Sequence, residues 1–115
     1  MNAGAPPEER DFLEILEAQR IEYRKACRSK FDALRAAWDR AGRGDAEGLR
    51  ELRRLAHTFA GSGPTFGFEA LGEAARALEA IVDRIGSRHA APAEAQRAEV
   101  ERAIAALERT LPDPE

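Results

Sequence analysis

The chain has 115 residues and a formal net charge of −3, and charged residues make up 34% of it while aromatic residues make up 6%. This length suits one domain and is too short for two independent cores. The acidic balance argues against a nucleic-acid-binding protein, because neutralising phosphates requires a basic surface. Ala, Leu, Glu and Arg recur throughout the chain, and such a composition favours an all-α fold.

The cysteine content and the distribution of apolar residues further restrict the class of protein and its cellular location. Cys27 is the single cysteine, so the chain forms no internal disulfide and offers no metal site with cysteine spacing. The N-terminus has neither the basic nor the apolar region of a signal peptide, and no apolar run reaches the roughly 18 residues of a membrane helix. We therefore expect a cytoplasmic protein that contacts neither membrane nor nucleic acid.

The chain reads as one helical domain between two short ends. Residues 1–7 and residues 112–115 contain prolines and are expected to form a flexible arm and a tail, which leaves residues 8–111 as the domain. The first predicted helix runs from about Glu8 to Ala41, because apolar side chains repeat along one helical face. That face carries Phe12, Leu16, Tyr23, Cys27, Phe31, Leu34 and Trp38.

Two isoleucines of this first helix lie off the apolar face. Ile15 and Ile21 would either widen the core or form a dimer seam. We favour the wider core, since the buried face of a helix in a globular protein is usually broad.

A turn at residues 42–45 should end the first helix, with Asp45 as the N-cap of the second. The second helix is expected to end near residues 61–63, because Pro64 opposes its continuation. It directs five apolar residues inward: Leu49, Leu52, Leu55, Ala56 and Phe59.

Two more helices complete the predicted fold. The third runs from about Phe68 to Ile85, and the fourth begins near Pro92, a favourable first-turn residue. Their inward residues are Leu71, Ala75, Leu78, Val82 and Ile85, followed by Val100, Ile104, Leu107 and Leu111. Four amphipathic helices with short connections predict an antiparallel up-down four-helix bundle.

The most informative residue is His57 on the second helix. At about 100° per residue it falls opposite the apolar arc and should face solvent. Ala60 and Gly61, one turn later, leave one side of the ring unobstructed. Three arginines precede the ring on the same outer face: Arg50, Arg53 and Arg54. A histidine nitrogen can carry a phosphoryl group, which guanidinium groups stabilise and small neighbours leave open to a partner.

Plainer interpretations stand beside this one. A lone histidine on a polar helix face is most often only solvated. The arginines could pair with Glu47 and Glu51, and residues 61–64 could be no more than a helix terminator. His89 lies far along the chain without the carboxylate spacing of a metal site.

The segment from His57 to Glu79 resembles the signature of histidine phosphotransfer (Hpt) domains. Within it, residues 63–68 are especially similar to the phosphotransfer domain at the start of chemotaxis histidine kinases. The likeness covers about residues 30–85. The matching positions are His57, Phe59, Gly61, Ser62, Gly67, Leu71, Leu78 and Glu79.

This resemblance implies a phosphoryl carrier of a bacterial phosphorelay, not an enzyme with its own ATP site. His57 would accept the phosphoryl group on Nε2 from a receiver-domain aspartate or from a histidine kinase, and pass it on. The Mg²⁺ needed for transfer would belong to the receiver domain, and the chain itself would need no cofactor. Glu79 matches a position that contacts the ring, where a carboxylate accepting from Nδ1 leaves Nε2 free. A plain surface role for Glu79 stays open.

One departure from the family concerns charge. The family usually has lysine three residues after the histidine, where this chain has Ala60. Arg53 or Arg76 would supply the missing cation, and we favour Arg53; Gly61 and Ser62 complete the expected surroundings of the ring.

Two other functions remain open. One is an adaptor that cannot be phosphorylated and regulates a receiver or kinase by occupying it, which Ala60 favours. The other is a helical interaction or dimerisation module with an incidental histidine. We expect a monomer that stands free rather than a fragment of a hybrid kinase.

Overall fold

The computed structural model describes residues 7–86 and 91–114, and within these ranges the chain forms four helices and no strand. Helix α1 spans Pro7–Gly42, α2 Ala46–Thr65, α3 Glu69–Ile85 and α4 Glu94–Arg109. The all-α prediction is thus confirmed for the described residues. The predictions about residues 1–6 of the N-terminal arm and about His89 lie outside them. Pro7, the last residue of the predicted arm, instead begins α1.

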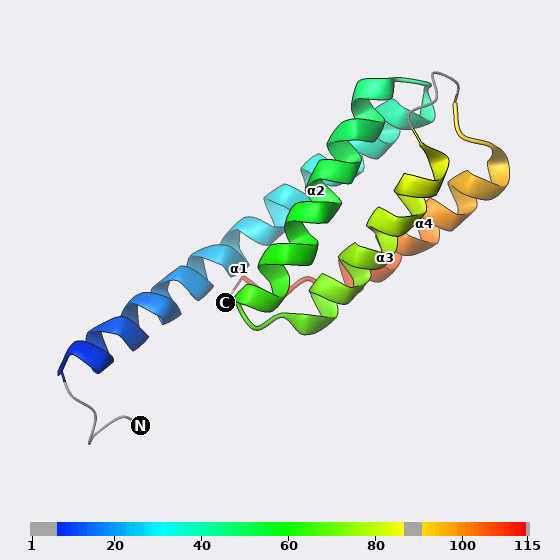
Figure 1. The fold of residues 1–115 in the computed structure, drawn as a ribbon. Coiled ribbons are helices and arrows are strands. Elements are labelled where there is room, and N and C mark those ends of the chain that lie inside the picture. Colours follow the sequence, from blue (N-terminus) through cyan, green and yellow to red (C-terminus); the bar gives the residue numbers. More distant parts are fainter. Residues whose placement is uncertain (1–6, 87–90, 115) are drawn as a thin grey trace.

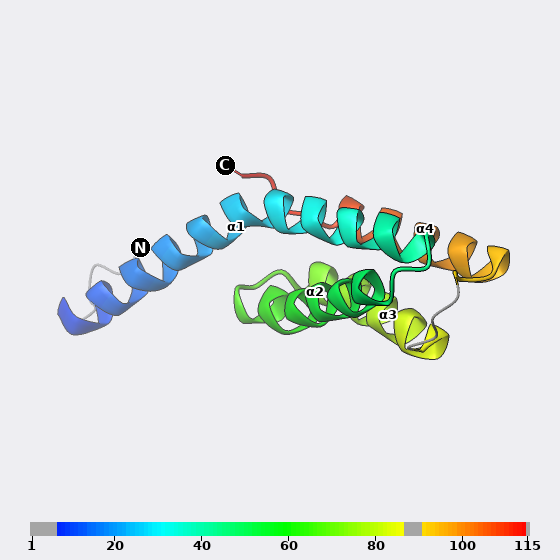
Figure 2. The same cartoon turned by 90° about the horizontal axis from the view of Figure 1, so that it is seen from above.

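The four helices lie side by side in two layers. Helix α2 packs against both α1 and α3, α3 packs against α4, and α4 approaches α1 more lightly. Figure 2 shows α1 and α4 above α2 and α3. Helix α1 is the longest, at 36 residues, and its N-terminal part projects beyond the end of α2 (Figure 1). The molecule is therefore elongated, with extents of 59 × 21 × 20 Å.

The core consists of apolar side chains that all four helices direct inward. Complete burial of one such side chain contributes about 1.5–3 kcal/mol to folding. The fully buried residues include Leu34 on α1, Leu52 and Phe59 on α2, Leu71 and Leu78 on α3, and Ile104 and Leu107 on α4. The inward faces predicted for the second, third and fourth helices are confirmed by these residues.

The prediction for the first helix was right for its second half and wrong for its first half. Tyr23, Cys27, Phe31, Leu34 and Trp38 are buried as predicted. In contrast, four apolar residues of the first half are exposed: Phe12 by 59%, Ile15 by 57%, Leu16 by 43% and Ile21 by 38%. The wider core that we favoured for Ile15 and Ile21 is therefore wrong. The N-terminal part of α1 extends past the helices that could have covered it (Figure 1). Ile21 lies level with the end of α2, where Arg20 and Tyr23 contact Phe66, but it points away from the buried face.

The ends of α2 follow from local hydrogen bonds. The side chain of Asp45 accepts a hydrogen bond from the backbone N–H of Glu47 at 3.0 Å, which confirms the predicted N-cap. At the other end the helix continues through Pro64 to Thr65, past the predicted stop. Pro64 has no N–H to donate to the carbonyl of Ala60, and the helix ends one residue later. The chain then reverses at Gly67, where φ is +89°.

The fourth helix begins later than predicted. Pro92 lies outside it, and the backbone N–H of Ala93 donates to the side chain of Gln96 at 2.9 Å, which fixes the start at Glu94. Leu111 lies beyond the end of α4, although it still packs half-buried against the core.

Helices α2 and α3 approach each other closely at two glycines. A Cβ atom added to Gly72 would lie 2.6 Å from Cγ and Cδ of Pro64, and one added to Gly63 would lie 3.0 Å from the backbone N of Gly72. This contact lies about two helical turns from His57 along α2, and a similar distance from Glu79 along α3. It therefore fixes how α2 and α3 are positioned along their axes relative to each other, and with them His57 and Glu79.

Candidate functional site

His57 projects from the outer face of α2. Its neighbours Ala56 and Phe59 are buried in the core, so the helical repeat turns the imidazole outward. The His57 side chain is 71% exposed, as the helical wheel predicts. A reacting group on another protein can thus reach the ring without any rearrangement of the bundle.

Glu79 on α3 holds one nitrogen of this ring. Its Oε2 atom lies 2.8 Å from Nδ1 of His57, and the Glu79 side chain is only 15% exposed. A neutral imidazole that donates Nδ1–H to the carboxylate keeps its lone pair on Nε2. The contact therefore presents Nε2 as the free nucleophilic nitrogen.

Arg53 places a cation beside this pair. Its guanidinium lies 3.7 Å from Oε2 of Glu79, and its Nε donates to Oδ1 of Asp83. The hydrogen bond to Asp83 raises the pKa of Arg53, so the guanidinium stays charged. Because the Arg53 side chain is 52% exposed, these ion pairs add little to folding stability. Their effect is local, since they keep a positive charge close to the histidine.

The two other arginines of this face are engaged elsewhere. Arg50 bonds to Glu47 and Arg54 bonds to Glu51, each within its own helix. For these two residues the plainer interpretation of ordinary surface pairing is confirmed.

The other residues predicted to surround the ring differ in where the structure places them. Gly61 is exposed, and a Cβ atom added there would meet nothing within 4 Å, so the surface after the ring is open. Ser62 does not belong to the surroundings of the imidazole, because its Oγ lies 2.7 Å from the hydroxyl of Tyr23 on α1. Ala60 is 6% exposed, so it is part of the core and not of the open outer surface. Arg76 is exposed on α3 and forms no ion pair within the described residues.

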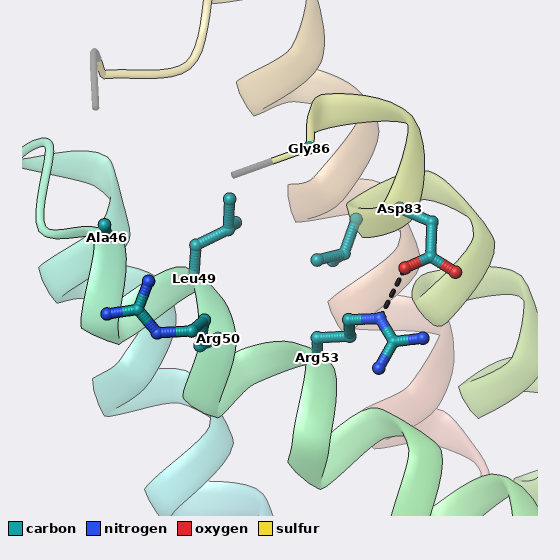
Figure 3. A pocket seen from close by; sticks show the side chains of 7 residues that line it. Ala46, Leu49, Arg50, Arg53, Asp83 and Gly86 are labelled. Atoms are coloured by element: carbon teal, nitrogen blue, oxygen red, sulfur yellow. Dashed lines mark hydrogen bonds and ion pairs between the residues drawn. The ribbon is translucent and has the colours of Figure 1, made fainter. Parts of the chain in front are cut away.

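A pocket adjoins the site between the start of α2 and the end of α3 (Figure 3). Leu49 and Val82 form its apolar part, and the pair of Arg53 and Asp83 closes one side. Arg53 lies one helical turn before His57, so the pocket and the imidazole share one side of the molecule. Sequence reasoning missed Asp83, although its place four residues after Glu79 puts the two on one helical face.

Among residues 7–86 and 91–114 no group of three or more His, Cys, Asp or Glu side chains is placed to hold a metal ion. No helix in those ranges combines the length and the apolar character needed to cross a bilayer.

The four-helix domain thus presents an accessible histidine whose Nδ1 contacts a mostly buried carboxylate. The family model of the Hpt domain matches residues 11–110, which is most of the chain, and the protein therefore belongs to the Hpt domain family. Comparisons with curated proteins and with solved structures gave no significant match. Hpt domains are phosphocarrier modules of phosphorelays rather than enzymes in the usual sense, and they generally interact with kinases and receiver domains.

Proposed function

We propose that this protein carries a phosphoryl group on Nε2 of His57 in a bacterial cytoplasmic phosphorelay. The donor or acceptor is the aspartate of a receiver domain, and a histidine kinase is the alternative donor. The observation that carries the proposal is the 2.8 Å contact between Glu79 and Nδ1 of an imidazole that is otherwise exposed.

The chemistry follows from that contact. The lone pair of Nε2 attacks phosphorus while the bond from phosphorus to the aspartate oxygen of the receiver breaks, and the aspartate leaves with the electron pair. The ring becomes more positive as the new bond forms, and the Glu79 carboxylate stabilises this charge through Nδ1–H. The Mg²⁺ of the receiver would neutralise the phosphoryl oxygens during transfer. Onward transfer is the reverse reaction with a second receiver.

We assign to Arg53 the role of the lysine that Hpt domains usually have at the position of Ala60. Its guanidinium is close to Glu79 and can turn from Asp83 towards phosphoryl oxygens on the neighbouring ring. Gly61 leaves room for the surface of the receiver, and the pocket at Leu49 and Val82 offers an apolar contact on the same side.

We extend the proposal to two finer points of the fold. The helices follow an antiparallel up-down order, which is supported by the short connections at residues 43–45 and 66–68 and by the ribbon in Figure 1. The detailed likeness is to the phosphotransfer domains of chemotaxis kinases, which is supported by residues 63–68.

Transfer of label from a receiver tests the proposal. Receiver domains of the source organism are phosphorylated with ³²P, and each is incubated with the protein and Mg²⁺. We expect acid-labile, alkali-stable label on the wild-type protein and none on His57→Gln. Label that persists on His57→Gln would overturn the assignment of the acceptor.

A second candidate function is the adaptor, because Ala60 replaces the usual lysine and is buried. The same experiment separates the two functions. A receiver that binds the protein tightly, yet transfers no label to it, would favour the adaptor over the carrier.

A further inference from the structure

Asp83 on α3 is the acidic partner of Arg53 on α2. The Nε atom of Arg53 donates to Oδ1 of Asp83, and Figure 3 shows the two side chains meeting between the helices. Asp83 lies one helical turn after Glu79, so the two carboxylates stand on the same face of α3. Arg53 is therefore held between two negative groups, and Glu79 is the one that also contacts the imidazole.

The helix itself does not favour an aspartate at position 83. The residue lies in the last turn of α3, which ends at Ile85. A negative charge there opposes the helix dipole, and aspartate is among the weaker helix formers. The side chains of the Arg53–Asp83 pair are about half exposed, so the pair contributes little to folding stability. The position of Asp83 therefore points to a role at the site.

The guanidinium of Arg53 approaches the ring on the side of Nδ1. Its Nη2 atom lies 3.7 Å from Oε2 of Glu79, the same oxygen that lies 2.8 Å from Nδ1 of His57. A phosphoryl group on Nε2 would project from the other side of the ring, because the two nitrogens of an imidazole point in diverging directions. Arg53 must therefore leave Asp83 before it can bind the phosphoryl oxygens.

We propose that Asp83 competes with the phosphoryl group on His57 for the guanidinium of Arg53. This inference rests on the proposed function. In the unphosphorylated protein Arg53 is paired with Asp83, whereas in the phosphorylated protein its N–H groups donate to phosphoryl oxygens and Asp83 is left to water. The phosphoryl group is the stronger acceptor, since it has close to two negative charges at neutral pH and a carboxylate has one. Asp83 is thus a positioning residue that acts through Arg53.

The competition affects how tightly the protein holds its phosphoryl group. The free energy needed to separate Arg53 from Asp83 is recovered when the phosphoryl group leaves and the pair forms again. Asp83 therefore shifts the balance of transfer towards release, which suits a carrier that must pass the group on. An exposed ion pair changes an equilibrium by up to about fivefold, so Asp83 adjusts the transfer without preventing it.

The equilibrium of transfer with a receiver domain tests the competition. A receiver phosphorylated with ³²P is mixed with each variant and Mg²⁺, and the label on both proteins is measured once their ratio is constant. Asp83→Asn keeps the size of the side chain and removes its charge, and it should raise the equilibrium constant for phosphorylation of His57 about threefold to fivefold. Asp83→Ala, which also removes the acceptor, should raise it at least as much. A constant at or below that of wild type in either variant would overturn the proposal.

Removing Arg53 separates competition from simple repulsion between negative charges. In the Arg53→Ala background, Asp83→Asn should change the equilibrium constant less than about 1.5-fold, because no guanidinium is left to compete for. Glu47→Gln is the matched control, since it removes the same charge from the partner of Arg50, one turn further from His57 on α2. The control should leave the constant unchanged. An equal effect of Asp83→Asn with and without Arg53, or an equal effect of Glu47→Gln, would overturn the competition in favour of general surface charge.

A failure of the competition is distinguishable from a failure of the proposed function. If no receiver labels the wild-type protein, the proposed function fails and the competition fails with it. If the wild type is labelled and Asp83→Asn has the same constant, only the competition fails. Circular dichroism checks that each variant folds, and a damaged site would lower the constant where the competition raises it.

Discussion

The carboxylate of Glu79 meets the imidazole of His57 across two helices, with 2.8 Å between Oε2 and Nδ1. The same oxygen lies 3.7 Å from the guanidinium of Arg53. Because both contacts fall on one mostly buried carboxylate, Glu79 links the tautomer and the orientation of the His57 ring to the position of the Arg53 guanidinium.

Replacing Glu79 by glutamine should slow phosphotransfer about tenfold to a hundredfold. Glutamine keeps the size of the side chain but loses the negative charge that stabilises the ring as Nε2 attacks phosphorus. The measurement is the rate at which label moves from a phosphorylated receiver to the protein. Glu73→Gln, an exposed position on α3, serves as the control and should leave the rate unchanged. An equal rate in Glu79→Gln and wild type would remove Glu79 from the site.

Replacing Arg53 by alanine should lower the rate of phosphotransfer about tenfold, since a charge-assisted hydrogen bond to the phosphoryl group is lost. Arg50→Ala is the matched control, because Arg50 lies one turn earlier on α2 and is paired with Glu47. We expect Arg50→Ala to transfer at the wild-type rate. If both variants slow the reaction equally, the effect comes from the general charge of the surface and not from Arg53.

Gly61 gives a test of access that leaves the fold intact. A leucine there meets no atom of the protein near its Cβ and gains helix propensity, so the free energy of unfolding should rise by up to about 1 kcal/mol. The same side chain stands in the path of a docking receiver, and transfer should fall about tenfold or more. Gly61→Ala should show an intermediate rate. Unchanged transfer in Gly61→Leu would mean that the receiver approaches from another side.

The close contact of α2 with α3 predicts the opposite effect on stability for another glycine. Gly72→Ala should lower the free energy of unfolding by about 1–3 kcal/mol, because the added Cβ would lie 2.6 Å from the Pro64 ring. Urea unfolding measures the change. Gly61→Ala is the matched control, since the same substitution on an open helix face should stabilise the protein.

Tyr23 should make stability fall at high pH. Burial raises the pKa of Tyr23 from 10.0 to about 12. The folded state thus favours the neutral phenol, and the stability present below pH 10 is lost as the pH rises towards 12. At pH 11 the loss should be about 1.4 kcal/mol.

Tyr23→Phe separates this effect from other titrations. At neutral pH the variant should be about 1 kcal/mol less stable than wild type, because the hydrogen bond to Ser62 is lost. By pH 11 the two proteins should have nearly equal stability in urea. A constant difference between pH 8 and pH 11 would show that Tyr23 does not ionise in this range.

The inward faces of three helices and the outward direction of His57 could be predicted from the sequence, because the spacing of apolar residues fixes which side chains share a face. The contact of Glu79 could not be derived that way. It joins residues 22 positions apart, and only the likeness to Hpt domains indicated it.

The spacing of apolar residues also does not predict which element, if any, packs against the face that they form. Phe12 and Leu16 continue the apolar face of α1, yet no helix covers them. Ala60 was expected beside the open ring and is buried, and Ser62 bonds to Tyr23, which lies 39 positions away. These placements depend on the lengths and relative positions of whole helices, which a local pattern does not contain.

Because the main chains of α2 and α3 approach closely at Gly63 and Gly72, the His57 ring and the Glu79 carboxylate are held in a defined relative position. The loss of freedom needed to align them occurs once, when the protein folds, and not at every encounter with another protein. Each protein that docks therefore meets Nε2 of His57 in the same orientation. Surface side chains can differ without disturbing this arrangement, and they determine which proteins bind.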